Sequence, residues 1–391
     1  MEICDSLHCT GCGMCSNICP HNAIEMKEGE HGFIYPHIYG DKCINCGLCK
    51  KKCPANTEKQ TECTMKKVYG AWNVAKNTRK RSTSGGICSL LEDEILKDGG
   101  AITGVKWDAD FHAEHALAFE KNQTEKFRGS KYVQSKTGDI YIKVKELLEN
   151  GKEVLFTGTP CQVAALKSFL GKDYCGLFTV DLVCHGVPAH DCFKRYLNEV
   201  SSAYNKKVVN VRFRYKSPYW DYCSVRIDFE DGADYQEYTV DDPFFTLFNI
   251  GYSLRESCHT CKYTSSHREG DITLADFWGY QPSSFKMRNY NKGVSLILVN
   301  TDKGDELFER IKGKICYETS TVEAALKTNN SLTKPFSPPC DAVIRFWNDY
   351  DGGEFSIEDL QRKYVPNPFR LPNLLFLRRL KRRYSWMIKR K

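Results

Sequence analysis

CTGCGMCSNICP, residues 9–20, decides the fold of the first part of this chain, and residues 43–54 repeat its spacing as CINCGLCKKKCP. Both runs read C-x2-C-x2-C-x3-C-P. Three closely spaced thiolates can bind one face of a four-iron cubane, while the fourth cysteine, ahead of a proline that turns the chain, reaches a second cluster. The repeat therefore predicts a pair of 4Fe-4S clusters.

The two runs are expected to exchange their last cysteines. One cluster is then held by Cys9, Cys12, Cys15 and Cys53, and the other by Cys43, Cys46, Cys49 and Cys19. Zinc also takes four thiolates, but zinc sites usually pair two C-x2-C arms and do not repeat a four-cysteine run that ends in proline. Cys4 and Cys63 lie outside both runs and are interpreted as unligated thiols. Residues 1–56 are thus predicted to form an α+β ferredoxin-like dicluster domain.

A chain of 391 residues holds more than this domain, because a typical domain has about 100 to 200 residues. With 41% hydrophobic and 27% charged residues, the chain has the composition of an ordinary globular protein. Residues 57–66 are polar and aperiodic, which indicates a linker. Residues 67–340 alternate short β-rich runs with helical stretches, and this predicts an α/β domain with a mixed sheet. Residues 341–391 are assigned to a C-terminal extension.

The cysteines and the N-terminus together indicate a cytoplasmic protein. Most of the ten cysteines among the first 63 residues have metal-ligand spacing rather than the spacing of a disulfide scaffold. The chain starts without a signal peptide, and no apolar run approaches the roughly 18 residues that a membrane span needs.

The formal charge of +7 is concentrated at one end, since residues 370–391 hold nine Lys or Arg and no acid. A charge confined to a terminus argues against a nucleic-acid-binding core and for a local electrostatic attachment. Apolar and basic residues alternate here at helical spacing, which suits a helix on the anionic inner face of a membrane. A solvated or self-packing basic helix is the alternative.

Several motifs of the body carry chemistry. Ser84-Gly85-Gly86 opens a helix, so its free N–H groups suit a pyrophosphate, although an ordinary N-cap would look the same. Cys161 starts a helix, Cys184 follows a strand, and Cys258 and Cys261 form a C-x2-C pair. These four thiols are enough for one more metal centre. Their spacing does not separate a 4Fe-4S cluster from a zinc site or a redox-active cysteine pair.

These motifs occur in one order along the chain: Ser84-Gly85-Gly86, Lys131-Tyr132-Val133-Gln134, Gly158-Thr159-Pro160-Cys161-Gln162, Cys184-His185-Gly186, Cys258-x2-Cys261 and Asp276-Phe277-Trp278-Gly279. The series, over roughly residues 68–340, resembles the coenzyme F-420 hydrogenase/dehydrogenase beta subunits. That family includes 7-hydroxymethyl chlorophyll a reductase and bacterial members associated with surface-polysaccharide genes.

The resemblance implies a bound FAD and a third 4Fe-4S cluster on Cys161, Cys184, Cys258 and Cys261. It places the FAD diphosphate near Ser84, Gly85 and Gly86. By motif position, Lys131, Gln134, Thr159 and Asp276 are then candidates to line the flavin pocket.

The working hypothesis is an iron-sulfur flavoprotein oxidoreductase. An external donor, such as a ferredoxin or a hydrogenase or dehydrogenase subunit, reduces the N-terminal clusters, and FAD reduces an organic substrate or a deazaflavin; the reverse direction is equally allowed. His185 is a candidate general acid or, alternatively, a hydrogen-bonding residue beside a ligand. Two other hypotheses are a non-catalytic electron-transfer subunit and a redox enzyme of surface-polysaccharide biosynthesis.

Overall fold

A computed structural model describes residues 2–217 and 219–366 of the chain. The predicted basic helix at residues 370–391 lies outside these residues. No helix within the described ranges is both long and apolar enough to cross a membrane.

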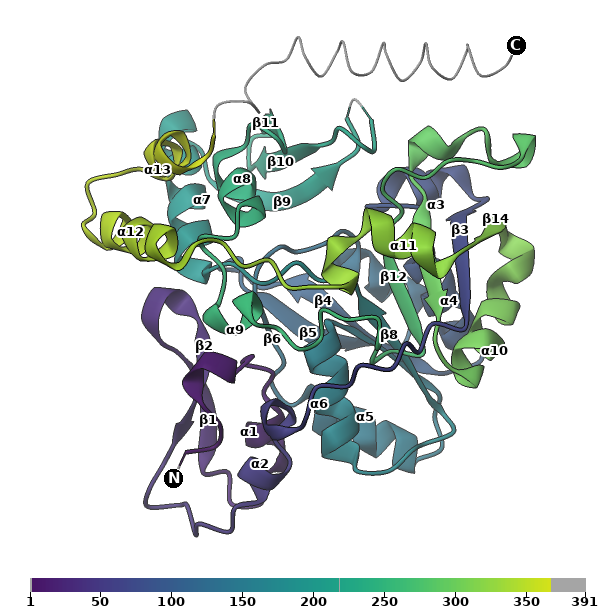
Figure 1. Cartoon of the computed structure of the whole chain (residues 1–391), viewed down its shortest axis with the longest axis horizontal. Coiled ribbons are helices and arrows are strands. Elements are labelled where there is room, and N and C mark those ends of the chain that lie inside the picture. Colours follow the sequence, from purple (N-terminus) through teal and green to yellow (C-terminus); the bar gives the residue numbers. More distant parts are fainter. Residues whose placement is uncertain (1, 218, 367–391) are drawn as a thin grey trace.

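The N-terminal domain is built on a repeat, as its sequence predicts. A hairpin of two antiparallel strands, β1 (Ile24–Glu28) and β2 (Ile34–Ile38), lies beside the short helices α1 (Met14–Ile18) and α2 (Leu48–Lys51). Each helix is preceded by a glycine with positive φ, 75° at Gly13 and 74° at Gly47, a conformation that residues with a Cβ adopt reluctantly. Figure 1 shows this domain as a separate lobe below the larger body.

The body is built on a nine-stranded mixed sheet with the order β14-β3-β13-β12-β8-β7-β4-β5-β6. Its centre, β12-β8-β7-β4, is parallel, and the strands β13, β3 and β14 beyond it are antiparallel to their neighbours. The strands are β3 (Lys67–Asn73), β4 (Ala101–Trp107), β5 (Ala113–Ala118), β6 (Ser135–Lys136), β7 (Val154–Gly158), β8 (Leu177–Leu182), β12 (Ile272–Asp276), β13 (Ser295–Val299) and β14 (Ile315–Ser320). The predicted fold class is confirmed.

Helices cover both faces of this sheet. The helices α4 (Cys88–Lys97) and α10 (Asp302–Ile311) pack on one face, and α5 (Ile140–Glu149), α6 (Pro160–Leu170) and α11 (Val322–Thr328) pack on the other. All five residues of β13 are buried, because successive side chains of a strand point to opposite faces and both faces are covered.

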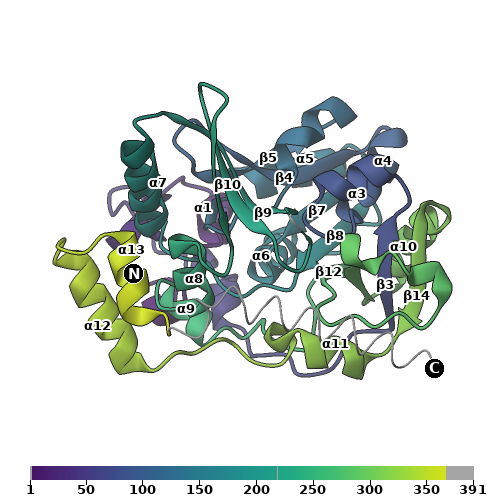
Figure 2. The ribbon, with the colours of Figure 1, turned by 90° about the horizontal axis from the view of Figure 1, so that it is seen from above.

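A smaller sheet with its own core lies at one end of the body, opposite β3 and β14 (Figure 2). Its strands are β9 (Val208–Tyr215), β10 (Ser224–Phe229) and β11 (Asp234–Tyr238), and its helices are α7 (His190–Tyr204), α8 (Pro243–Asn249), α12 (Cys340–Asp351) and α13 (Ile357–Tyr364). Phe346 of α12 and Leu360 of α13 are fully buried in this core. The described part of the predicted C-terminal extension is therefore packed against the body.

Candidate functional site

The first N-terminal cysteine set forms where the two cysteine runs meet. Cys53, from the second run, lines one small cavity with Cys9, Cys12 and Cys15 from the first. Burial and then the neighbouring thiols of Cys12, Cys9 and Cys53 raise the pKa of Cys15. The structure thus brings together the four cysteines that the exchanged pairing requires. Cys4, interpreted as an unligated thiol, also lines this cavity.

The second set lies at the surface. Burial and the nearby thiols of Cys19 and Cys46 raise the pKa of Cys49. Cys46 is exposed, whereas Cys43 and Cys19 are half-buried. Cys43 also lines a surface hollow of about 760 Å³ that reaches Cys9 of the first set. An external electron donor can approach this second set.

The residues present fit 4Fe-4S clusters. The lining of the first cavity holds no carboxylate and no imidazole. Backbone N–H groups point at the thiols, from Gly11 to Cys9 and from Met14 to Cys12, and the N–H of Ala23 lies 3.4 Å from Cys19 Sγ. Such N–H donors stabilise the negative charge of cluster sulfurs.

The first set is turned toward the body. The carbonyl oxygen of Cys12 accepts hydrogen bonds from the Tyr141 hydroxyl at 2.8 Å and from the Thr137 hydroxyl at 3.2 Å. On the neighbouring turns, Asn17 donates to the Gly138 carbonyl at 2.7 Å and Ser168 to the Lys52 carbonyl at 2.6 Å. The N-terminal domain is thus attached through the backbone around its cysteines.

The third cysteine set lies at the carboxyl ends of adjacent parallel strands. Cys161 follows β7 in the first turn of α6, Cys184 follows β8, and Cys258 and Cys261 come from α9 (Glu256–His259) and the turn after it. Burial and the thiols of Cys261 and Cys184 raise the pKa of Cys258 to about 12, and the same two neighbours act on Cys161. The structure therefore brings the four thiols together. Which metal centre they hold stays a prediction, because four thiols fit a 4Fe-4S cluster and a zinc site alike.

Thr159, a predicted flavin-pocket residue, lies beside Cys161 of the third cysteine set. Its contact with a flavin stays a prediction. Thr159 caps α6, and its hydroxyl lies 3.1 Å from Cys161 Sγ. Its N–H and hydroxyl both bond to Gln162 Oε1, each at 3.0 Å, which fixes the turn that presents Cys161.

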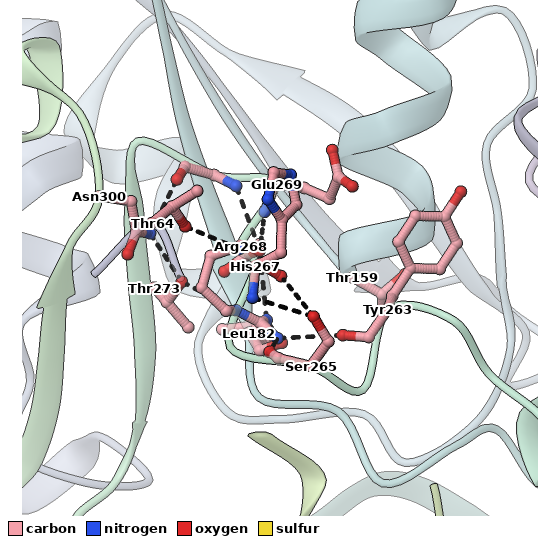
Figure 3. Close-up of polar contacts among 12 residues, drawn as sticks. Thr64, Thr159, Leu182, Tyr263, Ser265, His267, Arg268, Glu269, Thr273 and Asn300 are labelled. Atoms are coloured by element: carbon pink, nitrogen blue, oxygen red, sulfur yellow. Dashed lines mark hydrogen bonds and ion pairs between the residues drawn. The ribbon is translucent and has the colours of Figure 1, made fainter. Parts of the chain in front are cut away.

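Arg268 connects the segment that follows Cys261 with the sheet, and Figure 3 shows its contacts with Tyr263, Leu182 and Thr273. Its guanidinium forms a fully buried ion pair with Asp181 of β8 at 3.2 Å and donates to the Leu182 carbonyl at 3.1 Å. It also donates to the Tyr263 carbonyl at 3.1 Å, two residues after Cys261. Sequence reasoning missed Arg268 and Asp181, although a single acid within the apolar strand around residues 177–182 is a detectable signal.

The first and third sets are neighbours. The Cys12 thiol is among the groups that raise the pKa of Cys161. Two largely buried tyrosines, Tyr141 and Tyr263, each interact electrostatically with both Cys12 and Cys161. The first set therefore lies next to the third, and the surface hollow lined by Cys43 of the second set reaches Cys9 of the first.

The Ser84-Gly85-Gly86 loop lies against β3 and β13. Gly85 N–H donates to Ser295 Oγ at 3.0 Å, and a Cβ on Gly85 would lie 2.8 Å from the Ser295 backbone nitrogen and still closer to the Ala71 carbonyl. The following helix α4 has no side-chain cap at its N-terminus. Because the Leu90 and Leu91 N–H groups donate to the Ile87 carbonyl, at 2.9 and 3.2 Å, only the N–H groups ahead of Leu90 could serve a ligand here.

Basic and hydroxyl side chains surround this loop. Arg128 donates to Ser82 Oγ at 3.3 Å and Ser89 Oγ at 3.0 Å, and Lys216 donates to the Ser84 carbonyl. Burial lowers the pKa of Lys216 to about 7 and that of Lys131 to about 8. A nearby anion would favour the charged form of both lysines. This environment fits the diphosphate of a dinucleotide such as FAD, and sequence reasoning missed Arg128 and Lys216.

Asp276 ends β12 and pairs with Arg214 at 2.9 Å, with both side chains at most 10% exposed. Trp220 Nε1 donates to its other oxygen at 2.7 Å. The stacked rings of Trp220 and Trp278, 5.3 Å apart, lie beside this pair. Arg214 Nη2 is buried without a hydrogen-bond partner among the described residues, so a polar ligand group could be bound there.

Two predicted residues have other surroundings. Gln134 lies between the two domains, where its Oε1 accepts from the Ile34 N–H at 3.2 Å and its Nε2 donates to the Thr10 carbonyl at 3.3 Å. We therefore leave it out of the flavin pocket. His185 packs between the rings of Phe248 and Phe336, and burial lowers its pKa. Its role as a general acid stays a prediction.

Comparisons with known proteins agree with this organisation. Residues 151–325 match the family model for the C terminus of the coenzyme F420 hydrogenase/dehydrogenase beta subunit, and residues 8–57 match that of a 4Fe-4S dicluster domain. A search of curated proteins found no match.

The solved structures to which this chain is similar include a chain of the F420-reducing [NiFe] hydrogenase complex from Methanosarcina barkeri. The two are 18% identical with a TM-score of 0.44, and the match covers 78% of this chain and 94% of that one. The two family models account for both the cysteine-rich lobe and the strands that carry the third cysteine set. The chain therefore carries a match to the C terminus of the coenzyme F420 hydrogenase/dehydrogenase beta subunit at residues 151–325 and a match to a 4Fe-4S dicluster domain at residues 8–57.

Proposed function

We propose that this protein is an iron-sulfur flavoprotein oxidoreductase, in which three cysteine-bound 4Fe-4S clusters connect an external electron donor with an FAD that serves an organic substrate. One observation carries the proposal: Tyr141, whose hydroxyl donates to the Cys12 carbonyl at 2.8 Å, interacts with both the Cys12 thiol and the Cys161 thiol, so the first and third sets are neighbours. When bound, the clusters supply single-electron transfer and the flavin supplies hydride transfer.

The residues of the chain have distinct tasks in this proposal. The exposed Cys46 set meets the donor. The Cys161 set receives support from the Thr159 cap and from Arg268. Arg128, Lys216 and the Ser84–Gly86 loop bind the diphosphate. The family name makes a deazaflavin the first substrate to test.

The test is anaerobic reduction of the full chain by a reduced ferredoxin, followed by rapid mixing with a deazaflavin. We expect the bound flavin to bleach in wild type and in Cys175→Ser, an exposed cysteine outside all three sets. The double variant Cys161→Ser/Cys258→Ser should keep its reducible N-terminal clusters and lose flavin bleaching. Equal bleaching rates in the double variant and wild type would show that electrons do not use the third set.

A further inference from the structure

Arg255 is inserted between the two domains. It is fully buried and lies three residues before Cys258. Its Nε donates to the Cys9 carbonyl at 2.6 Å, and its backbone N–H donates to the Val187 carbonyl at 2.9 Å. Its guanidinium lies 4.0 Å from the ring centre of Tyr35 in the N-terminal hairpin. One side chain thus connects the first cysteine set with the third.

Gln134 and Gly11 complete this contact. Gln134 Oε1 accepts from Arg255 Nη1 at 3.2 Å. Gly11 has a φ of 64°, and a Cβ there would lie 3.2 Å from Arg255 Nη1 and closer to the Gln134 amide. Only glycine fits between these side chains, so the approach of the two domains depends on the backbone of the cysteine loop itself.

The charge of Arg255 has no carboxylate partner in its hydrogen bonds within the described residues. Its bonds go to a carbonyl and an amide oxygen, and Nη2 is buried without a partner. The other arginine beside the C-x2-C pair, Arg268, is compensated by Asp181. A buried cation without an anion is strongly unfavourable. An anion supplied by something else is therefore expected next to Arg255.

The thiols of the first and third cysteine sets become anionic thiolates when they bind a cluster. Arg255 lies next to both sets, because its Nε donates to the Cys9 carbonyl and its own carbonyl accepts from the Cys258 N–H at 2.9 Å. Both sets that Arg255 faces would carry net negative charge once four thiolates bind a 4Fe-4S cluster. Reduction adds one more negative charge, which a fixed nearby cation stabilises.

We propose that Arg255 is the counter-charge shared by the clusters of the Cys9 and Cys258 sets, raising the reduction potential of both, and that its hydrogen bonds fix the N-terminal domain on the body. Arg255 is a positioning residue: it affects electron transfer through the two clusters and does not itself touch the substrate. The inference rests on the proposed function, because it needs those two clusters.

The test of the charge is a redox titration of the anaerobically purified full chain, followed by electron paramagnetic resonance. In Arg255→Gln, two of the three cluster transitions should shift to more negative potentials, while the transition of the surface set stays in place. Arg255→Lys keeps the charge and should titrate near wild type. Arg195→Gln is the matched control, because Arg195 also bonds to backbone carbonyls but lies on α7. Unchanged transitions in Arg255→Gln, or an equal shift in Arg255→Lys, would overturn the role of the charge.

The test of docking is hydrogen exchange in the same preparations. Amides of residues 9–12 and 33–35 should exchange faster in Arg255→Gln, and also in Gln134→Leu, which keeps the arginine charge and should keep the potentials. Wild-type exchange in both variants would overturn the docking role. A wild-type protein with iron but without flavin would contradict the proposed function. The cluster potentials of the Arg255 variants could still be measured in such a protein. Unshifted potentials in a variant with its full iron content contradict only the role of Arg255.

Discussion

Single residues show where sequence reasoning reaches its limit. The eight N-terminal cysteines could be assigned to clusters because they lie in two repeated local runs, whereas the cluster on the third set was implied only by the resemblance. The contacts of Arg255 were not predictable, since Arg255 is 246 residues from Cys9 and 121 residues from Gln134 along the chain. A buried arginine or glutamine is recognised only when the groups that satisfy it are placed in space.

His115 is a buried histidine, and we expect its burial to make the stability of the fold depend on pH. Its ring stacks on Phe156, and burial lowers its pKa from 6.5 to about 4. Between these values the unfolded chain binds more protons than the folded one, so this group weakens the fold as the pH falls.

Replacement of His115 by leucine should remove this dependence. The loss of unfolding free energy between about pH 8 and about pH 5.5 should become smaller than in wild type by about 1.4 kcal/mol. Denaturant unfolding at both pH values measures it, with the same substitution at the exposed His21 as control. If His115→Leu kept the full wild-type pH dependence, the burial of this imidazole would not be what destabilises the fold in acid.

At the scale of elements, the observed strand-loop-helix units agree with those that the hydrophobic patterns of the sequence predict. The helix predicted after Ser84-Gly85-Gly86 is α4, and it ends before Gly99, whose φ is 77°. The helix predicted to start at Cys161 is α6, which begins one residue earlier, at Pro160. The small sheet β9–β11 was not predicted, because its residues carry no motif and its core is completed by α12 and α13 from far along the chain.

The Ser84–Gly86 loop gives a prediction at this scale. Gly85→Ala places a methyl group against the Ala71 carbonyl and the Ser295 backbone, neither of which can move without disturbing β3 and β13. We expect the flavin content of the purified protein to fall at least several-fold, as measured by fluorescence after heat release. Gly313→Ala is the control, because a Cβ there meets nothing within 4 Å. An unchanged flavin content in Gly85→Ala would remove this loop from the flavin site.

At the scale of the whole molecule, the candidate functional residues lie along one edge of the parallel centre of the sheet. Cys161 and Cys184 follow the carboxyl ends of β7 and β8, and Asp276 is the last residue of β12; these three strands are neighbours in the sheet. Open α/β sheets bind ligands at this edge. The cysteine lobe docks there through the Cys12 backbone. The sequence indicates the motifs but not that they lie at the same edge of the sheet, since the strand order depends on pairings between segments far apart in the chain.

The most direct test of this account is the iron and flavin content of the full chain purified without oxygen. Three cubane clusters and one flavin predict about twelve iron atoms and about one FAD per chain. The Cys161→Ser/Cys258→Ser variant should retain about eight iron atoms, as only the two N-terminal sets stay complete, and Cys175→Ser should match wild type. A wild-type protein without flavin, or the same iron content in the double variant and wild type, would contradict the account.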